Sequence, residues 1–559
     1  MATVLFGKRQ LLIGLAVCAF LQVASLRTRR IVPALPDIPI ATVGLFEPDG
    51  EYPGEAFTNA SSVRKWGSWS GSDDNAGTIT LGPFPAPRRL RLGIGGYPGH
   101  EGNALRLELA DQSRSMPLKP ADVGERWNIQ DFELPAGWEG RPMRIVGTDT
   151  AIGVGGWFSI TEPVRGGRSE GNNALIRSLA AFAINGLLLG VIYWAAVQLL
   201  SRFNWSRGAP AGDEHNAAGA PHPHHAEMPW LAPHWIPLGA GAIVALCGYA
   251  AFWAYFVNAI VGVIFSWTVI AAAACTILCD GWPRDRGHPV PSDRMQAGRP
   301  RSREITTVLI LMLTIGAFHI SLLHLFPTSH DFYTLAANRH REAMPSDNEL
   351  PHTTAQRLFA SESLKNPIDE WLSSDRPPLQ AGWQLLTWPA TKVLGHDRRT
   401  ASGTSAVWFQ LLWIAAACGL LRSFAVERVR AAGWIAALAL CGFFVQNTTY
   451  TWPKLAAGAF ACGAVGVLLF PTAGSGLRRN AMSAAGFAGL AWLAHGGVAF
   501  SFLAFLPLLA WRVWRTGWRR WAPAALALAV LVSPWLAYQT FYDPPANRLF
   551  KWHLAGQSG

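Results

Sequence analysis

Residues 327–403 hold the side chains best suited to chemistry, because nine acidic residues lie there among eight basic ones. A polar stretch of this length between two apolar runs is long for a simple connection and is typical of a functional loop. The first acidic residue, Asp331, follows the preceding apolar run almost directly, in Ser329-His330-Asp331-Phe332-Tyr333. A carboxylate at the boundary between membrane and water is well placed to act as a base. A solvated loop carboxylate or a helix cap is the alternative for Asp331.

The second candidate element is Ser374-Asp375-Arg376-Pro377-Pro378-Leu379, which combines a charge pair with two prolines. Asp375 is a second carboxylate candidate, and its alternative is an ion pair with Arg376 or a local turn bond. The prolines fix φ and predict an extended entry into a helix that carries Trp383 and lies along the membrane interface.

The composition indicates a membrane protein with a large water-exposed part. Of 559 residues, 50% are hydrophobic and 15% are charged, against roughly 25% charged in an ordinary soluble domain. The mean hydropathy of +0.18 is too low for a chain made only of spanning helices. The net charge of +11 would suggest nucleic-acid binding in a soluble protein, but in a membrane protein it indicates basic cytoplasmic loops. We therefore expect a lipid bilayer and no nucleic acid as partners.

Apolar runs long enough to cross a bilayer predict about eleven spans. The runs lie at 10–26, 174–200, 236–256, 258–279, 305–326, 404–421, 432–446, 453–471, 481–494, 498–511 and 522–540. Arginines gather in the connections 281–303, 422–430, 478–479 and 512–520. If the spans alternate in direction, these four connections lie on the same side of the membrane, which the positive-inside rule identifies as the cytoplasm. Because arginines flank 481–511 at both ends, His495-Gly496-Gly497 should be the tip of a helical hairpin that points outward.

This organisation predicts a polytopic α-helical membrane protein with an N-terminal extracytoplasmic β-sandwich, in a bacterial inner membrane. Short β-rich runs separated by Gly, Pro and Asp predict the sandwich. Its many aromatic residues either contact glycan, or fill the core or lie at the bilayer surface. The expected parts are an anchor or signal helix (1–30), the β-sandwich (31–170), three membrane helices with a His-rich cytoplasmic linker (171–280), a basic cytoplasmic loop (281–304), a membrane core with the outer loop 327–403 (305–541), and an extracytoplasmic tail (542–559). The tail either completes the site or ends a shortened form of a longer protein.

From Asp331 to Arg376-Pro377-Pro378-Leu379, the outer loop resembles membrane glycosyltransferases of the GT-C superfamily, which use polyprenyl-phosphate-linked sugars. Those enzymes have an essential acidic residue in the first large outer loop, just after a span, and several have a basic-Pro-Pro-Leu element farther along. The resemblance covers roughly residues 305–540. The order of an anchor, an outer β domain and a return helix in residues 10–200 is also similar to the front end of cell-wall arabinosyltransferases. Many GT-C enzymes have two adjacent acidic residues at the first position, whereas here His330 and Phe332 flank Asp331.

The resemblance implies roles for individual residues. Asp331, with Asp375 as the second carboxylate, would take the proton of the acceptor hydroxyl, because the departing lipid phosphate needs little acid assistance. Arg376, Lys454 and His495 would hold the donor phosphate. The alternatives are a Lys454 that snorkels to the headgroups and a structural or interfacial His495. Tyr333 and Trp383 would contact the acceptor or sugar. We assign no metal ligands and no certain cofactor, and a divalent cation stays open.

We therefore expect a glycosyltransferase that moves a sugar, arabinofuranose by the second resemblance, from a polyprenyl phosphate to a cell-envelope glycan on the outer face of the membrane. The alternative is a transporter or flippase for lipid-linked sugars with a glycan-binding β domain. Its expected signature, charged residues within the spans, is nearly absent. A third interpretation is an envelope-binding protein without catalysis, in which Asp331 and Arg376 would tolerate substitution.

Overall fold

The computed structural model describes residues 16, 18–25, 38–48, 50, 64–120, 124–165, 170–203, 231–279, 292–325, 332–337, 346–368, 371–471, 476–544 and 548. The chain divides into two compact units, each with its own hydrophobic core. One comprises Leu26–Ala174 and Phe326–Asp331, and the other comprises Met1–Ser25, Leu175–Leu325 and Phe332–Gly559.

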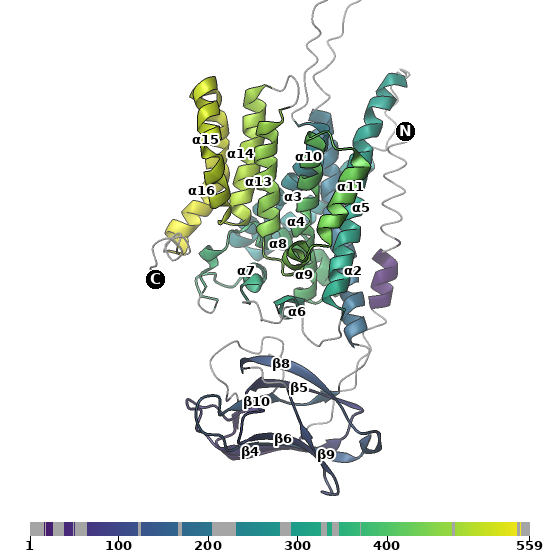
Figure 1. Ribbon diagram of the computed structural model, residues 1–559, viewed down its shortest axis with the longest axis vertical. Helices are drawn as coiled ribbons and strands as arrows, with labels where there is room; N and C mark the ends of the chain where they lie inside the picture. Colours follow the sequence, from purple (N-terminus) through teal and green to yellow (C-terminus); the bar gives the residue numbers. More distant parts are fainter. Residues whose placement is uncertain are drawn as a thin grey trace, which may run out of the picture. The chain divides into compact units, whose positions relative to one another are not determined.

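The first unit consists of two antiparallel sheets, whose layers are visible in Figure 1. One sheet has the order β1 (Ile40–Gly44), β4 (Gly77–Pro85), β9 (Pro142–Asp149), β6 (Asn103–Leu109) and β7 (Ser115–Leu118). The other has the order β11 (Val164–Arg165), β5 (Arg89–Gly96), β10 (Phe158–Thr161), β3 (Lys65–Gly67) and β2 (Glu47–Pro48), with β8 (Gly124–Glu133) beside β5. These sheets confirm the two-sheet β region that the sequence predicts.

Strand β5 shows how the sequence specifies this unit. Its alternating side chains bury Leu90, Leu92 and Ile94 completely. The residue between the two leucines, Arg91, points to the other face and pairs with Asp131 of β8 at 2.8 Å. This period of two is what a sheet with one buried face requires.

The second unit is a bundle of helices (Figure 1). Its helices are α2 (Glu170–Phe203), α3 (Ile236–Val257), α4 (Ala259–Cys279), α5 (Ser292–Leu323), α6 (Phe332–Ala337), α7 (Leu350–Phe359), α8 (Leu379–Val393), α9 (Arg398–Gln410), α10 (Leu412–Ser423), α11 (Arg428–Ala439), α12 (Gly442–Thr449), α13 (Lys454–Leu469), α14 (Leu477–Ala494), α15 (Val498–Thr516) and α16 (Ala522–Ala537). Short turns η4 (Ser373–Asp375), η5 (Trp518–Arg520) and the π-helical η6 (Tyr538–Tyr542) connect some of them.

Among the described residues, seven helices are long and apolar enough to cross a membrane, or eight if α11 and α12 form one span. The prediction of about eleven spans is therefore not confirmed for this part of the chain. Helices α11 and α12 are bent by 75° at their junction. Helix α13 has 16 residues, fewer than the roughly 20 that a bilayer needs. Helix α14 begins with Arg478 and Arg479, which lower its hydropathy. Of the predicted first span at 10–26, residues 10–15, 17 and 26 lie outside the described residues.

The helices bring the arginine groups together at one end of the bundle, which we call the arginine-rich end (residues 232–235, 303–304, 422–430, 468–470, 476–479 and 512–521). Arg422 at the end of α10 pairs with Glu304 of α5 at 3.0 Å. Ser423 lies 3.0 Å from Nε2 of His234, which precedes α3. Arg512 near the end of α15 donates to the carbonyl of Leu468 at the end of α13. The starts of α13 and α15 consequently lie at the opposite end of the bundle.

Residues 327–403 are not an open loop where the structure describes them. Helices α6, α7, α8 and the start of α9 occupy most of this stretch. Thirteen consecutive residues of α8, Leu379–Thr391, are buried, and α8 packs against α3. The prediction of an interfacial helix after Pro377-Pro378 is therefore wrong: α8 lies inside the helical unit, because its whole circumference contacts other helices.

Candidate functional site

Three predicted phosphate ligands meet around one indole ring at the end of the bundle opposite the arginine-rich end. Nζ of Lys454 lies 3.4 Å from the centroid of the Trp452 ring, and Cζ of Arg376 lies 5.6 Å from it. The ring centroids of His495 and Trp452 are 5.9 Å apart. We call Arg376, Trp452, Lys454 and His495 the Trp452 cluster. It joins segments that are up to 119 positions apart in the sequence.

The backbone directly before Trp452 takes an unusual conformation, which sets the direction in which the chain carries Trp452 and Lys454. Thr451 has φ of 60°, in the left-handed region that residues with a Cβ seldom adopt. Its carbonyl accepts a hydrogen bond from Nε2 of Gln380 at 2.8 Å, and Gln410 also donates to it. The side chain of Gln410 in turn accepts from the backbone N–H of Ala456 in α13. These fully buried glutamines stabilise the strained turn that brings the chain from α12 into α13.

Arg376 also lies against a second aromatic ring, that of Trp371. Its guanidinium carbon lies 4.5 Å from the Trp371 ring centroid. Stacked guanidinium groups keep their N–H edges directed outward, so they remain able to bind an anion. Lys454 is exposed and Arg376 half-buried, which leaves the cluster accessible at the surface of the helical unit.

His495 occupies the turn between α14 and α15, as the sequence predicts for the tip of the helical hairpin. The backbone N–H of Gly497 donates to Nδ1 at 3.1 Å, so the neutral ring carries its proton on Nε2. Burial, together with the positive charges of Arg376 and Lys454, lowers the pKa of His495 to about 4. His495 is therefore a neutral hydrogen-bond donor at physiological pH.

Asp375 lies beside the cluster but has both carboxylate oxygens engaged. Oδ2 accepts from the N–H of Leu372 at 2.9 Å and pairs with Nη2 of Arg548, while Oδ1 accepts from Nε of Arg548 at 3.3 Å. Only 2% of the side chain is exposed. This geometry suits a residue that orders η4 and Arg376 better than one that receives a proton from an acceptor.

Asp543 holds the other side of η4. Its carboxylate accepts hydrogen bonds from Oγ of Ser373 at 2.7 Å and from the N–H of Ser374 at 2.9 Å. Gln539, in the π-helical turn η6, donates to the carbonyl of Ser374. The end of the last candidate span, with Gln539, and the residue that follows it, Asp543, thus complete the setting of Arg376. The sequence offers little signal for these pairings, because about 170 residues separate the partners.

Tyr333 and Trp383, the predicted acceptor contacts, lie buried away from the Trp452 cluster's surface. The Tyr333 hydroxyl lies 2.8 Å from Oγ of Ser402 and accepts from Gln384. The indole N–H of Trp383 donates to the carbonyl of Ser405 at 3.0 Å. Each side chain already makes the polar contacts of a core residue.

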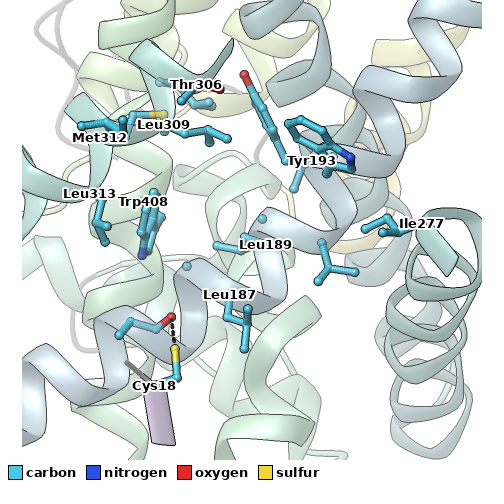
Figure 2. A pocket seen from close by; sticks show the side chains of 18 of the residues that line it. Cys18, Leu187, Leu189, Tyr193, Ile277, Thr306, Leu309, Met312, Leu313 and Trp408 are labelled. Atoms are coloured by element: carbon cyan, nitrogen blue, oxygen red, sulfur yellow. Dashed lines mark hydrogen bonds between the residues drawn. The ribbon is translucent and has the colours of Figure 1, made fainter. Parts of the chain in front are cut away.

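Trp383 also lines an apolar cavity of about 430 Å³ inside the helical unit. Figure 2 shows its wall, with Leu187 and Leu189 of α2 and Met312 and Leu313 of α5 around the space. Cys18 donates to the carbonyl of Ala183 at its edge. None of the Trp452 cluster lines this cavity, and its apolar surface suits hydrocarbon rather than sugar.

Asp331, the predicted base, lies outside the described residues. Within the described part of the chain, no group of three His, Cys, Asp or Glu side chains could hold a metal ion. No individual role was predicted for Trp371, Trp452, Asp543 or Arg548, although one of the two alternatives for the tail at 542–559 is that it completes the site. Trp452 directly precedes Pro453-Lys454. Its position beside a predicted cationic ligand is the one sequence signal that could have identified Trp452.

No family model and no curated protein matches this chain. Among solved structures, the chain is similar to the C-terminal extracellular domain of EmbC from Mycobacterium tuberculosis, with 18% sequence identity and a TM-score of 0.19. The match covers 25% of this chain and 60% of that chain, which is less than two thirds of its length.

Proposed function

We propose that this protein is an integral membrane glycosyltransferase that takes a sugar from a polyprenyl-phosphate donor. The observation that carries the proposal is the convergence of Arg376 and Lys454 on the Trp452 ring. Two fixed cations and a neutral N–H donor, His495, match the needs of a phosphate monoester or diester: charge neutralisation and directed hydrogen bonds. In the 115 positions between Glu427 and Asp543, the charged residues are arginines and a single lysine, Lys454.

In the proposed reaction, an acceptor hydroxyl attacks the anomeric carbon of the donor sugar. The bond between that carbon and the phosphate oxygen breaks, and polyprenyl phosphate leaves with the bonding electrons. Arg376 and Lys454 stabilise the growing negative charge on the phosphate, and Nε2–H of His495 donates to it. Asp331 takes the hydroxyl proton. Asp375 and Asp543 position Arg376 through η4, and Tyr333 and Trp383 have structural roles.

The arrangement of the bundle supports an extracytoplasmic site. The arginine-rich end is expected to face the cytoplasm, because basic residues in short loops are retained there. The Trp452 cluster lies at the other end. We accordingly assign the donor phosphate and a cell-envelope glycan acceptor to the outer face of a bacterial inner membrane, with arabinofuranose as the first sugar to test.

The test is transfer of radiolabelled sugar from a synthetic polyprenyl phosphate by the purified full chain in vesicles. We expect a labelled product with a new glycosidic bond, and at least a tenfold loss of kcat/KM in Arg376→Gln and in Lys454→Gln. Lys392→Gln is the matched control, because Lys392 also stacks on a ring, that of Phe359 at 5.0 Å, outside the cluster. Equal rates for Lys454→Gln and Lys392→Gln would contradict the proposal. Movement of intact donor across sealed vesicles without a new glycosidic bond would instead support the flippase.

A further inference from the structure

The arginine-rich end contains a second basic and aromatic surface, which the proposed reaction does not use. Residues 511–521 read Trp-Arg-Val-Trp-Arg-Thr-Gly-Trp-Arg-Arg-Trp. Trp514 is 80% exposed and Trp518 is 67% exposed. Arg515, Arg519 and Arg520 are exposed as well. Such a surface needs a partner with both apolar and anionic groups.

The turn that carries these side chains is held in one conformation. Gly517, with φ of 85°, ends α15, and its N–H donates to the carbonyl of Val513. Trp521 is buried, and its indole N–H donates to Oγ1 of Thr516 at 2.8 Å. The arginines of η5 are therefore presented by an ordered backbone.

Two of the guanidinium groups are oriented by stacking on neighbouring indoles. Cζ of Arg515 lies 4.8 Å from the Trp511 ring centroid, and Cζ of Arg519 lies 5.9 Å from that of Trp518. Stacking leaves the planar N–H edge available for bidentate contacts with phosphate oxygens.

Charge complementarity points to the partner. No acidic residue lies between Glu427 and Asp543. Among the described residues, no carboxylate pairs with Arg515, Arg519 or Arg520. The surface also continues α15, a candidate span whose apolar window is only 6% buried and which exposes Phe500, Leu503 and Leu506. A molecule that offers hydrocarbon along α15 and an anion at its end is an anionic phospholipid.

We propose that residues 511–521 bind the phosphodiester headgroups of anionic phospholipids in the leaflet at the arginine-rich end. Trp514 and Trp518 lie at the level of the glycerol and headgroups, and the three arginines contact phosphate. This proposal is independent of the glycosyltransferase function.

The test uses the purified full chain in phosphatidylcholine bilayers that contain spin-labelled phosphatidylglycerol or spin-labelled phosphatidylcholine. Electron paramagnetic resonance gives the relative association constant of the two labels. We expect a preference for phosphatidylglycerol that falls about fivefold or more in the triple variant Arg515→Gln, Arg519→Gln, Arg520→Gln, since each basic residue near an anionic surface contributes an effect of about this size. The matched control is Arg88→Gln, Arg114→Gln, Lys119→Gln, which removes the same charge from exposed positions of the β unit.

Three outcomes would overturn the proposal: no preference in the wild-type chain, an unchanged preference in the triple variant, or an equal loss in the control. Addition of millimolar inorganic phosphate separates the lipid from a free anion. Phosphate that abolishes the preference would identify a general anion site and would also overturn the proposal. A preference that persists in Trp514→Leu but weakens would support the assignment of the indoles to the headgroup level.

Discussion

The carboxylate of Asp543 accepts a hydrogen bond from the backbone N–H of Ser374 at 2.9 Å, two residues before Arg376. Asp543 is 5% exposed and also binds Oγ of Ser373. A buried carboxylate that is satisfied by a turn fixes the conformation of that turn, because leaving either group unpaired is costly. The conformation of the candidate phosphate ligand thus depends on a residue beyond the last span.

Replacement of Asp543 tests this dependence. We expect Asp543→Asn to lower the free energy of unfolding by about 1–3 kcal/mol, the usual range for a lost charged hydrogen bond, and to raise KM for the donor. Thermal unfolding in detergent and initial rates measure the two effects. Glu427→Gln is the control, because Glu427 is 68% exposed and its 3.9 Å ion pair should contribute little. Unchanged stability and KM in Asp543→Asn would show that η4 does not need this carboxylate.

Two carboxylates should differ in the kinetic parameter that they control. We expect Asp331→Asn to lower kcat by about 10²–10⁴ with donor KM nearly unchanged, the effect of removing a general base. Asp375→Asn should mainly raise donor KM. The ion pair of Asp375 with Arg548 and its hydrogen bond from the N–H of Leu372 order the turn before Arg376. The reverse pattern, with kcat lost in Asp375→Asn alone, would exchange the two roles.

The depressed pKa of His495 predicts a specific pH dependence of stability. Burial and two nearby cations lower its pKa from the usual 6.5 to about 4 in the folded chain. Between these values the unfolded chain binds a proton that the folded chain does not, so stability falls as the pH decreases from about 6.5 towards 4. His495→Gln should reduce this slope, measured by the midpoint of thermal unfolding at several pH values. Identical slopes for the two chains would mean that His495 titrates normally.

Helices α3 and α8 lie so close together at Gly382 that the backbone there leaves no space for a side chain. A Cβ there would lie 2.1 Å from the carbonyl oxygen of Gly248, a backbone atom that cannot rotate away. We expect Gly382→Ala to destabilise the helical unit by about 1–3 kcal/mol through overpacking. Gly458→Ala on α13 is the matched control, because its Cβ would meet nothing within 4 Å. Thermal unfolding that shows equal midpoints would refute the close packing.

The amino-acid sequence by itself determined the membrane character, the two-sheet β region and the gathering of arginines in a few connections. These features are recorded locally: hydrophobic runs give apolar helices, and alternation gives strands such as β5. It also identified Arg376, Lys454 and His495 as separate candidates. For Arg376 that prediction depends on the resemblance of Arg376-Pro377-Pro378-Leu379 to a GT-C element, and for Lys454 and His495 it depends on their positions at the ends of apolar runs.

Only the tertiary structure decided that these three side chains share the Trp452 ring, and that Asp375 is occupied by Arg548. It also decided that α8 is buried rather than interfacial. Such facts depend on contacts between segments far apart in the chain, about 170 residues in the case of Asp375 and Arg548. Local propensity carries no information about which distant segment will cover a helix or neutralise a carboxylate, because that follows from how all the helices pack together.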